Sequence, residues 1–383
     1  MNRVGVLGAG QLGRMLALAG YPLGLRFRFL DPAAEAPAEH LAERVTGGFH
    51  ETEALHRFTE HLAVVTYELE NVPVELVRHL ERSLPVYPPP AALEASQDRL
   101  PEKSLFQRLG LPTVPFEPVE TRADLDRAVA VVGLPAVLKT RRFGYDGKGQ
   151  ALLRAPRDAE RAWAALGGRP LLLEGFVAFE RELSQIAVRG RDGATAFYPL
   201  VENHHRDGIL RLSLAPAPDL TPELEALARA HAMKVMEALG YVGVLTIEFF
   251  QQGATLIANE MAPRVHNSGH WTIEGAATSQ FENHLRAVLG WPLGSTATDG
   301  PCAMLNLIGT APDPAVILAV TDAHLHLYGK SPRPGRKLGH VTLRAPDSGT
   351  LAERLLRLRP LLPGGDERFP VEVHPAPSEP ENP

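Results

Sequence analysis

Cysteine is almost absent from the chain, and so are long apolar runs. Only one of the 383 residues, Cys302, is a cysteine, so no disulfide can form within the chain. No run of about 18 or more apolar residues occurs, which excludes a transmembrane helix, and the opening MNRVGVLGAG lacks the regions of a secretory signal peptide. Lys and Arg (39) are fewer than Asp and Glu (45), which argues against a nucleic-acid-coating protein. We therefore expect a cytoplasmic enzyme that contacts neither membrane nor nucleic acid.

The length predicts two or three domains, and 44% hydrophobic residues are enough for a sizeable core. In the N-terminal part, residues 3–8, 25–31 and 62–67 have the pattern of buried strands, and a helix is expected from Gln11 to Ala19. This order predicts a parallel sheet covered by helices. The Pro-rich segment 84–93 marks the first domain boundary.

The middle of the chain predicts helices interleaved with antiparallel hairpins, and Asp98 is expected to cap a helix that contains Pro101. The fold class is thus an α/β, Rossmann-like N-terminal domain, an α+β middle domain and a small, mostly-β C-terminal domain. Strands are expected at 136–140, 151–154, 171–174, 182–189, 196–201, 243–250 and 254–260, and helices near 122–132, 157–166 and 222–239. The domains are expected at 1–95, 96–295 and 296–375, followed by a disordered tail at 376–383.

The sequence Gly8-Ala9-Gly10-Gln11-Leu12-Gly13 forms a G-x-G-x-x-G motif between a strand and a helix. Such glycines let backbone N–H groups approach a phosphate at the helix N-terminus. Asp31 ends the next strand, as a dinucleotide-binding fingerprint requires. Taken alone, the motif supports an NAD-dependent oxidoreductase, and a purely structural glycine turn is the alternative.

Two further segments suit a nucleotide. Lys139 ends an apolar strand and precedes a Gly-rich loop carrying Lys148, a cationic cradle that fits a polyphosphate, although a surface hairpin with incidental lysines has the same pattern. The loop is not a Walker motif, because no Ser or Thr follows Lys148. Glu174 and Glu182 flank Val177 at a strand edge that could bind an adenine and a ribose. Ordinary exposed glutamates are the more frequent explanation of that second pattern.

The strongest signal is a pair of glutamates in apolar strands, Glu248 in VGVLTIEFF and Glu260 at the end of TLIANE. A carboxylate in such a strand is costly unless it is paired or binds a metal, and two of them suit Mg²⁺. A turn at 251–253 would separate the two by four positions, about 13 Å, so a shared metal requires an offset, a bulge or a bend. The loop that follows holds Arg264, His266, Asn267, Ser268 and His270, and is expected to bind substrate.

The order of these pieces resembles the ATP-grasp superfamily, from residue 3 to about 345. Finer motifs are similar to those of the N5-carboxyaminoimidazole ribonucleotide synthetases. They are GAGQLGRM, TYELENV at 66–72, SQDRL at 96–100, FGYDGKGQ at 143–150, ANEMAPRVHNSGHWT at 258–272 and YGKSPRPGRKLGH at 328–340.

The resemblance implies a carbon–nitrogen ligase of purine biosynthesis that uses ATP, Mg²⁺, bicarbonate and aminoimidazole ribonucleotide through carboxyphosphate, as a homodimer. It implies Arg264, Lys148 and His270 as catalytic residues and Glu248 and Glu260 as metal ligands. Implied ATP contacts are Arg99, Lys139, Gly144, Tyr145, Asp146, Gly147, Lys148, Gly149, Gln150, Glu174, Gly175, Phe176, Val177, Glu182, His205, Asn259 and Glu260. Implied substrate contacts are Gly10, Gln11, Leu12, Glu68, Asn71, Arg264, His266, Asn267, Ser268, Lys330 and Arg336.

Three alternatives stay open at this point. One is the related ATP-grasp enzyme that uses formate and glycinamide ribonucleotide, which usually has Glu where this chain has Gln11. Another is a nicotinamide dehydrogenase, which leaves the Glu248 and Glu260 pair unexplained. The third is a module that senses a nucleotide without turnover, which would not need two metal carboxylates.

Overall fold

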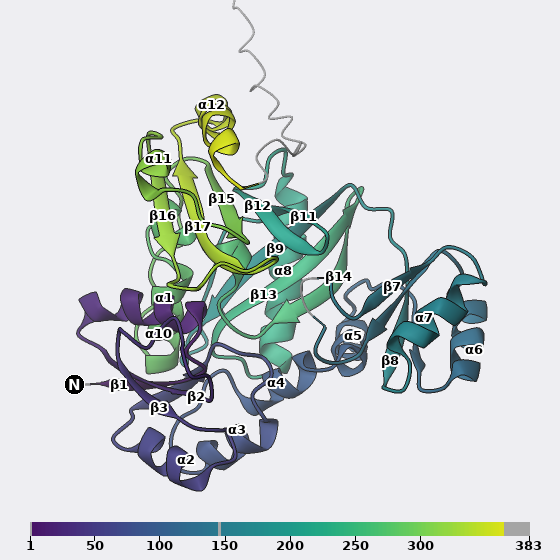
Figure 1. Ribbon diagram of the computed structural model, residues 1–383, viewed down its shortest axis with the longest axis horizontal. Helices are drawn as coiled ribbons and strands as arrows, with labels where there is room; N and C mark the ends of the chain where they lie inside the picture. Colours follow the sequence, from purple (N-terminus) through teal and green to yellow (C-terminus); the bar gives the residue numbers. More distant parts are fainter. Residues whose placement is uncertain (1, 145–146, 364–383) are drawn as a thin grey trace, which may run out of the picture.

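The computed structural model describes residues 2–144 and 147–363, so Tyr145, Asp146 and the expected tail at 376–383 lie outside the described residues. The described chain contains three β-sheets (Figure 1). The N-terminal sheet is parallel, in the order β3-β2-β1-β4, as the sequence predicts. Its strands are β1 (Arg3–Leu7), β2 (Arg26–Asp31), β3 (Glu43–Thr46) and β4 (Val64–Tyr67).

Helices cover both faces of this sheet, α2 (Thr52–Thr59) and α3 (Val74–Glu81) on one side and α1 (Gln11–Gly20) on the other (Figure 1). A short 3₁₀ turn, Tyr21–Leu23, follows α1. Strand β3 was not predicted, because Val45 is its one fully buried residue and a four-residue strand with one buried side chain has no apolar pattern to recognise.

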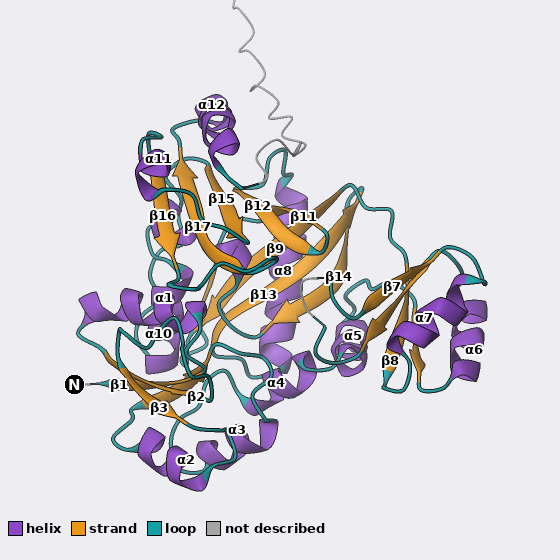
Figure 2. Cartoon of the chain, in the orientation of Figure 1, coloured by secondary structure: helices purple, strands orange, loops and turns teal. Residues whose placement is uncertain are grey.

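A small second lobe follows α4 (Pro90–Ser96) and α5 (Arg99–Arg108), and lies at the right of Figure 2. Its antiparallel sheet runs β5-β8-β6-β7 and carries α6 (Arg122–Val132) and α7 (Asp158–Leu166) on one face. The strands are β5 (Phe116–Val119), β6 (Ala136–Thr140), β7 (Gln150–Leu153) and β8 (Leu171–Gly175). The other face of the sheet is left to line a cavity.

The large sheet has nine strands, in the order β14-β13-β9-β11-β12-β15-β17-β16, with β10 beside β9. Its strands are β9 (Arg181–Arg189), β10 (Thr195–Phe197), β11 (Val201–Arg206), β12 (Ile209–Ala215), β13 (Gly243–Gln252), β14 (Thr255–Ala262), β15 (Cys302–Ile308), β16 (Ala323–Leu327) and β17 (Lys337–Arg344). The single strand predicted at 196–201 is wrong, because Pro199 cannot donate to a ladder and separates β10 from β11.

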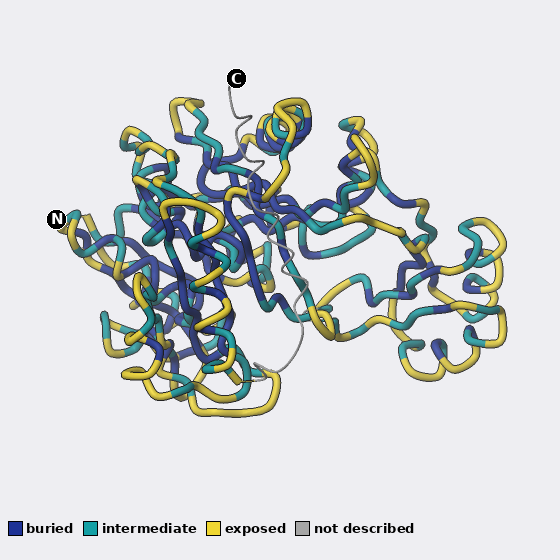
Figure 3. The backbone as a smooth tube through the Cα atoms, turned by 90° about the horizontal axis from the view of Figure 1, so that it is seen from above, coloured by how far each residue is buried: buried dark blue, intermediate teal, exposed yellow. Residues whose placement is uncertain are grey.

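The remaining helices pack around the large sheet. They are α8 (Pro222–Ala238), α9 (Thr272–Gly275), α10 (Gln280–Leu289), α11 (Pro314–Leu318) and α12 (Ser348–Leu358), with 3₁₀ turns at Asn267–Gly269 and Arg359–Leu361. Buried backbone follows the large sheet and the N-terminal sheet, whereas α6 and α7 of the small lobe have only two buried residues each (Figure 3). Within residues 2–144 and 147–363, no helix is both long enough and apolar enough to cross a membrane.

The start of α5 confirms the predicted cap, since Asp98 accepts a hydrogen bond from the Leu100 N–H at 3.0 Å. The same carboxylate receives two hydrogen bonds from Arg141, at 2.9 and 2.8 Å. Asp98 therefore fixes both the beginning of α5 and the segment where the Gly-rich loop leaves the small lobe.

Candidate active site

Two neighbouring cavities, which share Gly208 in their linings, contain most of the residues expected to act. The first cavity has a volume of about 520 Å³ and lies where the N-terminal domain meets the large sheet. The second has a volume of about 510 Å³ and lies between the small lobe and β13. Of the expected residues, the first cavity is lined by Gly10, Gln11, Leu12, Glu68, Asn71, Arg99, Gly144, His205, Glu248, Glu260, Arg264, His266, Asn267 and His270. The second is lined by Lys139, Gly147, Gln150, Glu174, Gly175, Phe176 and Val177.

Some expected residues are placed elsewhere. Among the described residues, those outside both linings are Lys148, Gly149, Glu182, Asn259, Ser268, Lys330 and Arg336. Sequence reasoning in turn missed several lining residues, notably Glu70, Arg141, Tyr328 and Lys337. Neither Lys337 nor Arg336 has a distinguishing sequence signal, because both are cations in the motif GRK.

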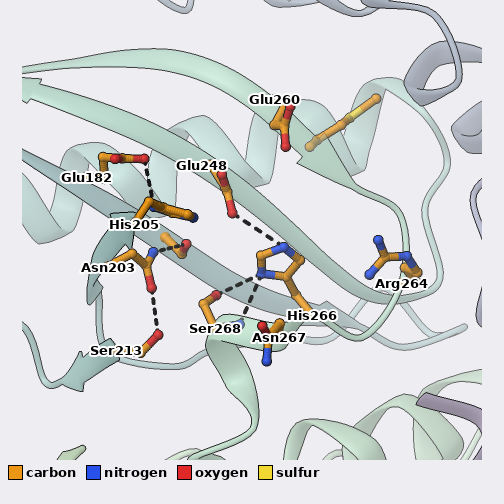
Figure 4. Close-up of polar contacts among 12 residues, drawn as sticks. Glu182, Asn203, His205, Ser213, Glu248, Glu260, Arg264, His266, Asn267 and Ser268 are labelled. Atoms are coloured by element: carbon orange, nitrogen blue, oxygen red, sulfur yellow. Dashed lines mark hydrogen bonds and ion pairs between the residues drawn. The ribbon is translucent and has the colours of Figure 1, made fainter. Parts of the chain in front are cut away.

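The β13–β14 hairpin brings Glu248 directly opposite Glu260. The expected turn at 251–253 and the four-position separation are wrong, because Gln252 pairs with Thr255 and leaves a two-residue turn. A regular ladder from that turn would pair Glu248 with Asn259. A bulge at Asn259 adds one residue to β14 and shifts the register, so Glu260 faces the same side as Glu248 (Figure 4).

The two carboxylates carry different partners. Glu260 Oε2 accepts a hydrogen bond from Arg99 Nη1 at 2.9 Å, whereas Glu248 Oε1 lies 3.4 Å from His266 Nε2 (Figure 4). Burial and the nearby Glu260 raise the pKa of Glu248 to about 7. Burial opposes ionisation of Glu260 as well, but Arg99 outweighs it and holds the pKa of Glu260 below its usual value.

The pair meets the requirement of a hard cation, because carboxylate oxygens are the ligands that Mg²⁺ prefers and a positive charge would favour ionisation of Glu248. In the described part of the chain, no three His, Cys, Asp or Glu side chains are grouped so as to hold a metal ion. A cation between these two carboxylates would therefore complete its coordination with water and phosphate oxygens.

The second cavity has a cationic floor and an aromatic wall. Lys139 Nζ donates to Glu174 Oε2 at 2.8 Å, and Lys103 Nζ lies 3.4 Å from the same oxygen. Burial disfavours the ionised form of Glu174, but the two lysines overcome it and lower its pKa to about 2. The explanation of Glu174 as an exposed glutamate is wrong, since 3% of the residue is exposed.

The other carboxylate oxygen of Glu174, Oε1, is buried and has no hydrogen-bond partner within the described chain. Beside it, Phe179 stacks on Phe250 with ring centroids 4.7 Å apart, and Phe176 is half exposed. An apolar wall next to an unused acceptor suits a heterocyclic base or a sugar hydroxyl.

The glycine motif at the start of α1 already holds an anion of the protein itself. Glu68 accepts hydrogen bonds from the backbone N–H of Gly10 and, at 2.6 Å, of Gly13. A Cβ atom at Gly10 would lie 2.5 Å from Glu68 Oε1, which explains the glycine there. Asp31 Oδ2 accepts a hydrogen bond from Ala9 N–H at 2.7 Å. Because these donors are used, the turn does not offer them to a dinucleotide pyrophosphate.

The loop after β14 lines the first cavity with Arg264, His266, Asn267 and His270. Arg264 Nη2 lies 2.6 Å from Glu70 Oε1, so a carboxylate already occupies the position of an oxyanion ligand. Burial lowers the pKa of His270 well below its usual value, which keeps its imidazole neutral.

Two hydrogen bonds fix parts of the site to neighbouring segments. Ser268 is fully buried, and its Oγ lies 2.9 Å from His266 Nδ1, so it orients that ring (Figure 4). At the far side, Lys330 Nζ donates to Gln11 Oε1 at 2.5 Å, which ties the C-terminal part to the glycine turn. Arg336 Nη1 contacts Ser331 O at 3.2 Å, outside the cavity.

Comparison with known proteins places the fold and site in a class. Family models match the ribonucleotide synthetase preATP-grasp domain at residues 1–97, the ATP-grasp domain at 104–281 and the phosphoribosylaminoimidazole carboxylase C-terminal domain at 302–354. The protein is thus an ATP-grasp ligase with a C-terminal domain of the carboxylase type, and the predicted fold class is confirmed.

Whole-chain relatives narrow the class. An N5-carboxyaminoimidazole ribonucleotide synthase of Pseudomonas aeruginosa is 54% identical over 94% of this chain and 99% of its own length. The crystal structure of the Thermus thermophilus synthetase superposes with a TM-score of 0.91 at 62% identity, covering 96% of this chain and all of that one. The crystal structure of an Aspergillus clavatus synthase in complex with ADP and 5-aminoimidazole ribonucleotide superposes with a TM-score of 0.87 at 34% identity. The match covers 94% of this chain and 97% of that one.

The chain belongs to the N5-carboxyaminoimidazole ribonucleotide synthase family. The resemblance inferred from the motifs is thereby confirmed. The dehydrogenase alternative fails on both the family and the occupied glycine turn. The family also favours a synthase over the formate-using relative and over a nucleotide sensor.

Proposed function

We propose that this protein carboxylates 5-aminoimidazole ribonucleotide with bicarbonate and ATP, giving N5-carboxyaminoimidazole ribonucleotide, ADP and phosphate in purine biosynthesis. Its family carries this name, and the Aspergillus clavatus relative was solved with ADP and 5-aminoimidazole ribonucleotide. The observation that carries the proposal for this chain is the adjacency of the two cavities, with Glu248 and Glu260 in the wall of one and Lys139 and Glu174 in that of the other.

ATP is assigned to the second cavity and its phosphates to the border with the first. The base would lie against the Phe179 and Phe250 pair, and Lys139 would meet a phosphate. The remaining assigned contacts are those implied by the sequence, with Arg99 and His205 reaching from the first cavity. Glu248 and Glu260 would hold Mg²⁺, which when bound neutralises charge on phosphoryl oxygens.

Aminoimidazole ribonucleotide and bicarbonate are assigned to the first cavity. The described cations of its lining are Arg99, Arg141, Arg264 and Lys337, which suit a phosphate and an oxyanion. Arg264 is assigned to bicarbonate, because a guanidinium binds a planar oxyanion through two hydrogen bonds. The bicarbonate would take the position that the Glu70 carboxylate now holds.

The reaction has two halves. A bicarbonate oxygen attacks the γ-phosphorus of ATP, the bond to the bridging oxygen breaks, and carboxyphosphate and ADP result. The exocyclic amine of the ribonucleotide then bonds to the carboxyl carbon, phosphate leaves with the bonding electrons, and the nitrogen loses a proton. His270, which lines the cavity, is assigned as the group that accepts this proton, and because burial disfavours its charged form it would hold the proton only in passing.

Positioning and charge neutralisation supply most of the rate enhancement. Lys148 and the Gly-rich loop at 144–150 would close over the phosphates, because carboxyphosphate reacts readily with water. We further propose a cytoplasmic homodimer and the domain division at residues 95 and 296. These assignments rest on the family resemblance and on the site.

The test is release of ADP by the purified protein with Mg-ATP and bicarbonate. Aminoimidazole ribonucleotide should stimulate release strongly, and glycinamide ribonucleotide with formate should not. Bicarbonate labelled with ¹⁸O should pass one labelled oxygen to the phosphate product, because carboxyphosphate keeps that oxygen. Stimulation by glycinamide ribonucleotide and formate alone would overturn the assignment.

A further inference from the structure

Strand β14 is an edge of the large sheet, and its bulge lies on that edge. An edge strand presents backbone N–H and C=O groups that no neighbouring strand can bind, and a bulge leaves its extra residue unpaired. Such groups are costly when they are buried without a partner. The way in which this edge is satisfied therefore decides whether the bulge is stable.

Helix α5 lies beside this edge and supplies the partners. Glu102 Oε1 accepts a hydrogen bond from the Met261 N–H at 2.7 Å, and Lys103 Nζ donates to the Asn259 carbonyl at 3.1 Å. These two contacts bracket Glu260. A third residue of the helix, Arg99, donates to the Glu260 carboxylate at 2.9 Å.

The two side chains are unusual for their type. Glu102 is 2% exposed and Lys103 is not exposed at all, although Glu and Lys are among the residues least often fully buried. Lys103 lines neither cavity and lies behind Glu174 at 3.4 Å, whereas Glu102 is part of the lining of the first cavity. Burying two such groups costs free energy unless they are paired. Both form hydrogen bonds to one short stretch of the β14 backbone, which indicates that they stabilise this stretch.

We propose that Glu102 and Lys103 are positioning residues that hold the bulge at Asn259 and thereby keep Glu260 opposite Glu248. Without the bulge, Asn259 would face Glu248 and Glu260 would point to the other side of the sheet, because side chains alternate along a strand. Lys103 lies outside both linings, and Glu102, although it lines the first cavity, uses Oε1 to accept from the Met261 N–H. The inference rests on the proposed function in one respect, the use of Glu260 as a metal ligand.

Lys103 also connects the two cavities. Its ammonium group contacts both the backbone of the bulge and Glu174, which accepts from Lys139 in the second cavity. The carboxylate pair in the first cavity is therefore fixed relative to the cationic floor of the second through one buried residue. The relative position of the two cavities is thereby fixed, and phosphoryl transfer between ligands bound in them depends on such positioning.

The test compares Glu102→Leu, Glu102→Gln and Lys103→Met with the wild type, and Gln107→Leu serves as control because Gln107 is an exposed residue of the same helix. Hydrogen–deuterium exchange reports the Met261 amide, and electron paramagnetic resonance reports the affinity for Mn²⁺ in the presence of ADP. Glu102→Leu should speed exchange of the Met261 amide at least about tenfold, because its acceptor is lost. It should also weaken Mn²⁺ binding by about 10–100-fold.

Glu102→Gln keeps an acceptor oxygen and should retain both properties, and Gln107→Leu should match the wild type. A folded Glu102→Leu protein with wild-type protection of Met261 and wild-type Mn²⁺ affinity would overturn the proposal. If that variant does not fold, Lys103→Met decides by the Mn²⁺ measurement. Wild-type Mn²⁺ binding by Glu260→Gln would instead refute the metal assignment, and the exchange result would still judge the bulge separately.

Discussion

Two parts of the molecule that present carboxylates to the first cavity differ in their partners: the loop after β4, whose Glu68 lies against the glycine turn before α1, and the β13–β14 hairpin. Beside the turn, Glu68 is 3% exposed and accepts hydrogen bonds from the Gly10 and Gly13 N–H groups. In the hairpin, Glu248 and Glu260 face each other, and Arg99 is bonded to one of them. Both arrangements come from motifs that, read alone, suggest a bound ligand.

The difference lies in what satisfies the charge. Glu68 has donors fixed by the backbone, so the glycine turn is complete without a ligand. Glu248 has a neighbouring carboxylate, which with burial raises its pKa to about 7, so a cation between the two carboxylates would favour the ionised form of Glu248. A glycine motif or a buried glutamate alone therefore does not identify a ligand site. A ligand site is identified by the hydrogen-bond donors, acceptors and charges that remain without a partner in the folded protein.

The largest expected effect is in the hairpin. Glu260→Gln removes one charge of the carboxylate pair and should lower kcat at least about 100-fold, because charge stabilisation at the phosphoryl group is lost. Circular dichroism should show an unchanged fold. The matched control is Glu223→Gln on the exposed start of α8, which should keep wild-type kcat. A Glu260→Gln protein with the wild-type rate would remove the metal assignment.

In the glycine turn, the expected effect is on stability. Glu68→Leu leaves the Gly10 and Gly13 N–H groups without their acceptor and should lower the free energy of unfolding by about 2–4 kcal/mol. Glu68→Gln retains one acceptor oxygen and should lose less. Urea denaturation measures both. A Glu68→Leu protein as stable as the wild type would show that the turn does not depend on its internal anion.

Acid should weaken the connection between the two regions. His284 contacts Thr66 of β4 at 2.8 Å and accepts from the Val244 N–H of β13 at 3.1 Å, and burial lowers its pKa to about 3. Below the unfolded-state pKa of about 6.5, the unfolded chain binds a proton that the folded protein excludes. The contribution of His284 is thus full above that pH and falls by about 1.4 kcal/mol per pH unit toward pH 3.

Urea denaturation between pH 7 and pH 5 checks this slope. The His284→Gln protein should be less stable at pH 7 and should lose less stability on acidification, since it lacks the titrating group. Equal slopes for the two proteins would exclude His284 as a source of acid sensitivity.

The smallest expected effect is a difference in KM between variants of two neighbouring cations, Lys337 and Arg336. Lys337 lines the first cavity, whereas Arg336 contacts Ser331 outside it. Lys337→Ala should raise the KM for aminoimidazole ribonucleotide about tenfold, the loss expected for one charged contact. Arg336→Ala should leave it near the wild-type value. The reverse order would restore the assignment made from the sequence.

Much of this organisation could be predicted because local patterns determine it. The parallel N-terminal sheet, the cap at Asp98 and the polar loop after β14 follow from periodicity and residue type. The register of β13 and β14 could not be predicted, since it depends on a bulge that α5 stabilises from outside the hairpin. Lys103 was missed for the same reason, as a lysine in a helix has no local signal of burial.

Binding of Mn²⁺ in the presence of ADP, followed by electron paramagnetic resonance, tests the contrast between the two carboxylate sites most directly. Wild-type protein and Glu68→Gln should bind the ion with similar affinity, because Glu68 is satisfied within the fold. Glu260→Gln should bind it at least about tenfold more weakly. Equal affinity for Glu260→Gln and wild type, or a loss confined to Glu68→Gln, would contradict the assignment of the cation to the β13–β14 hairpin.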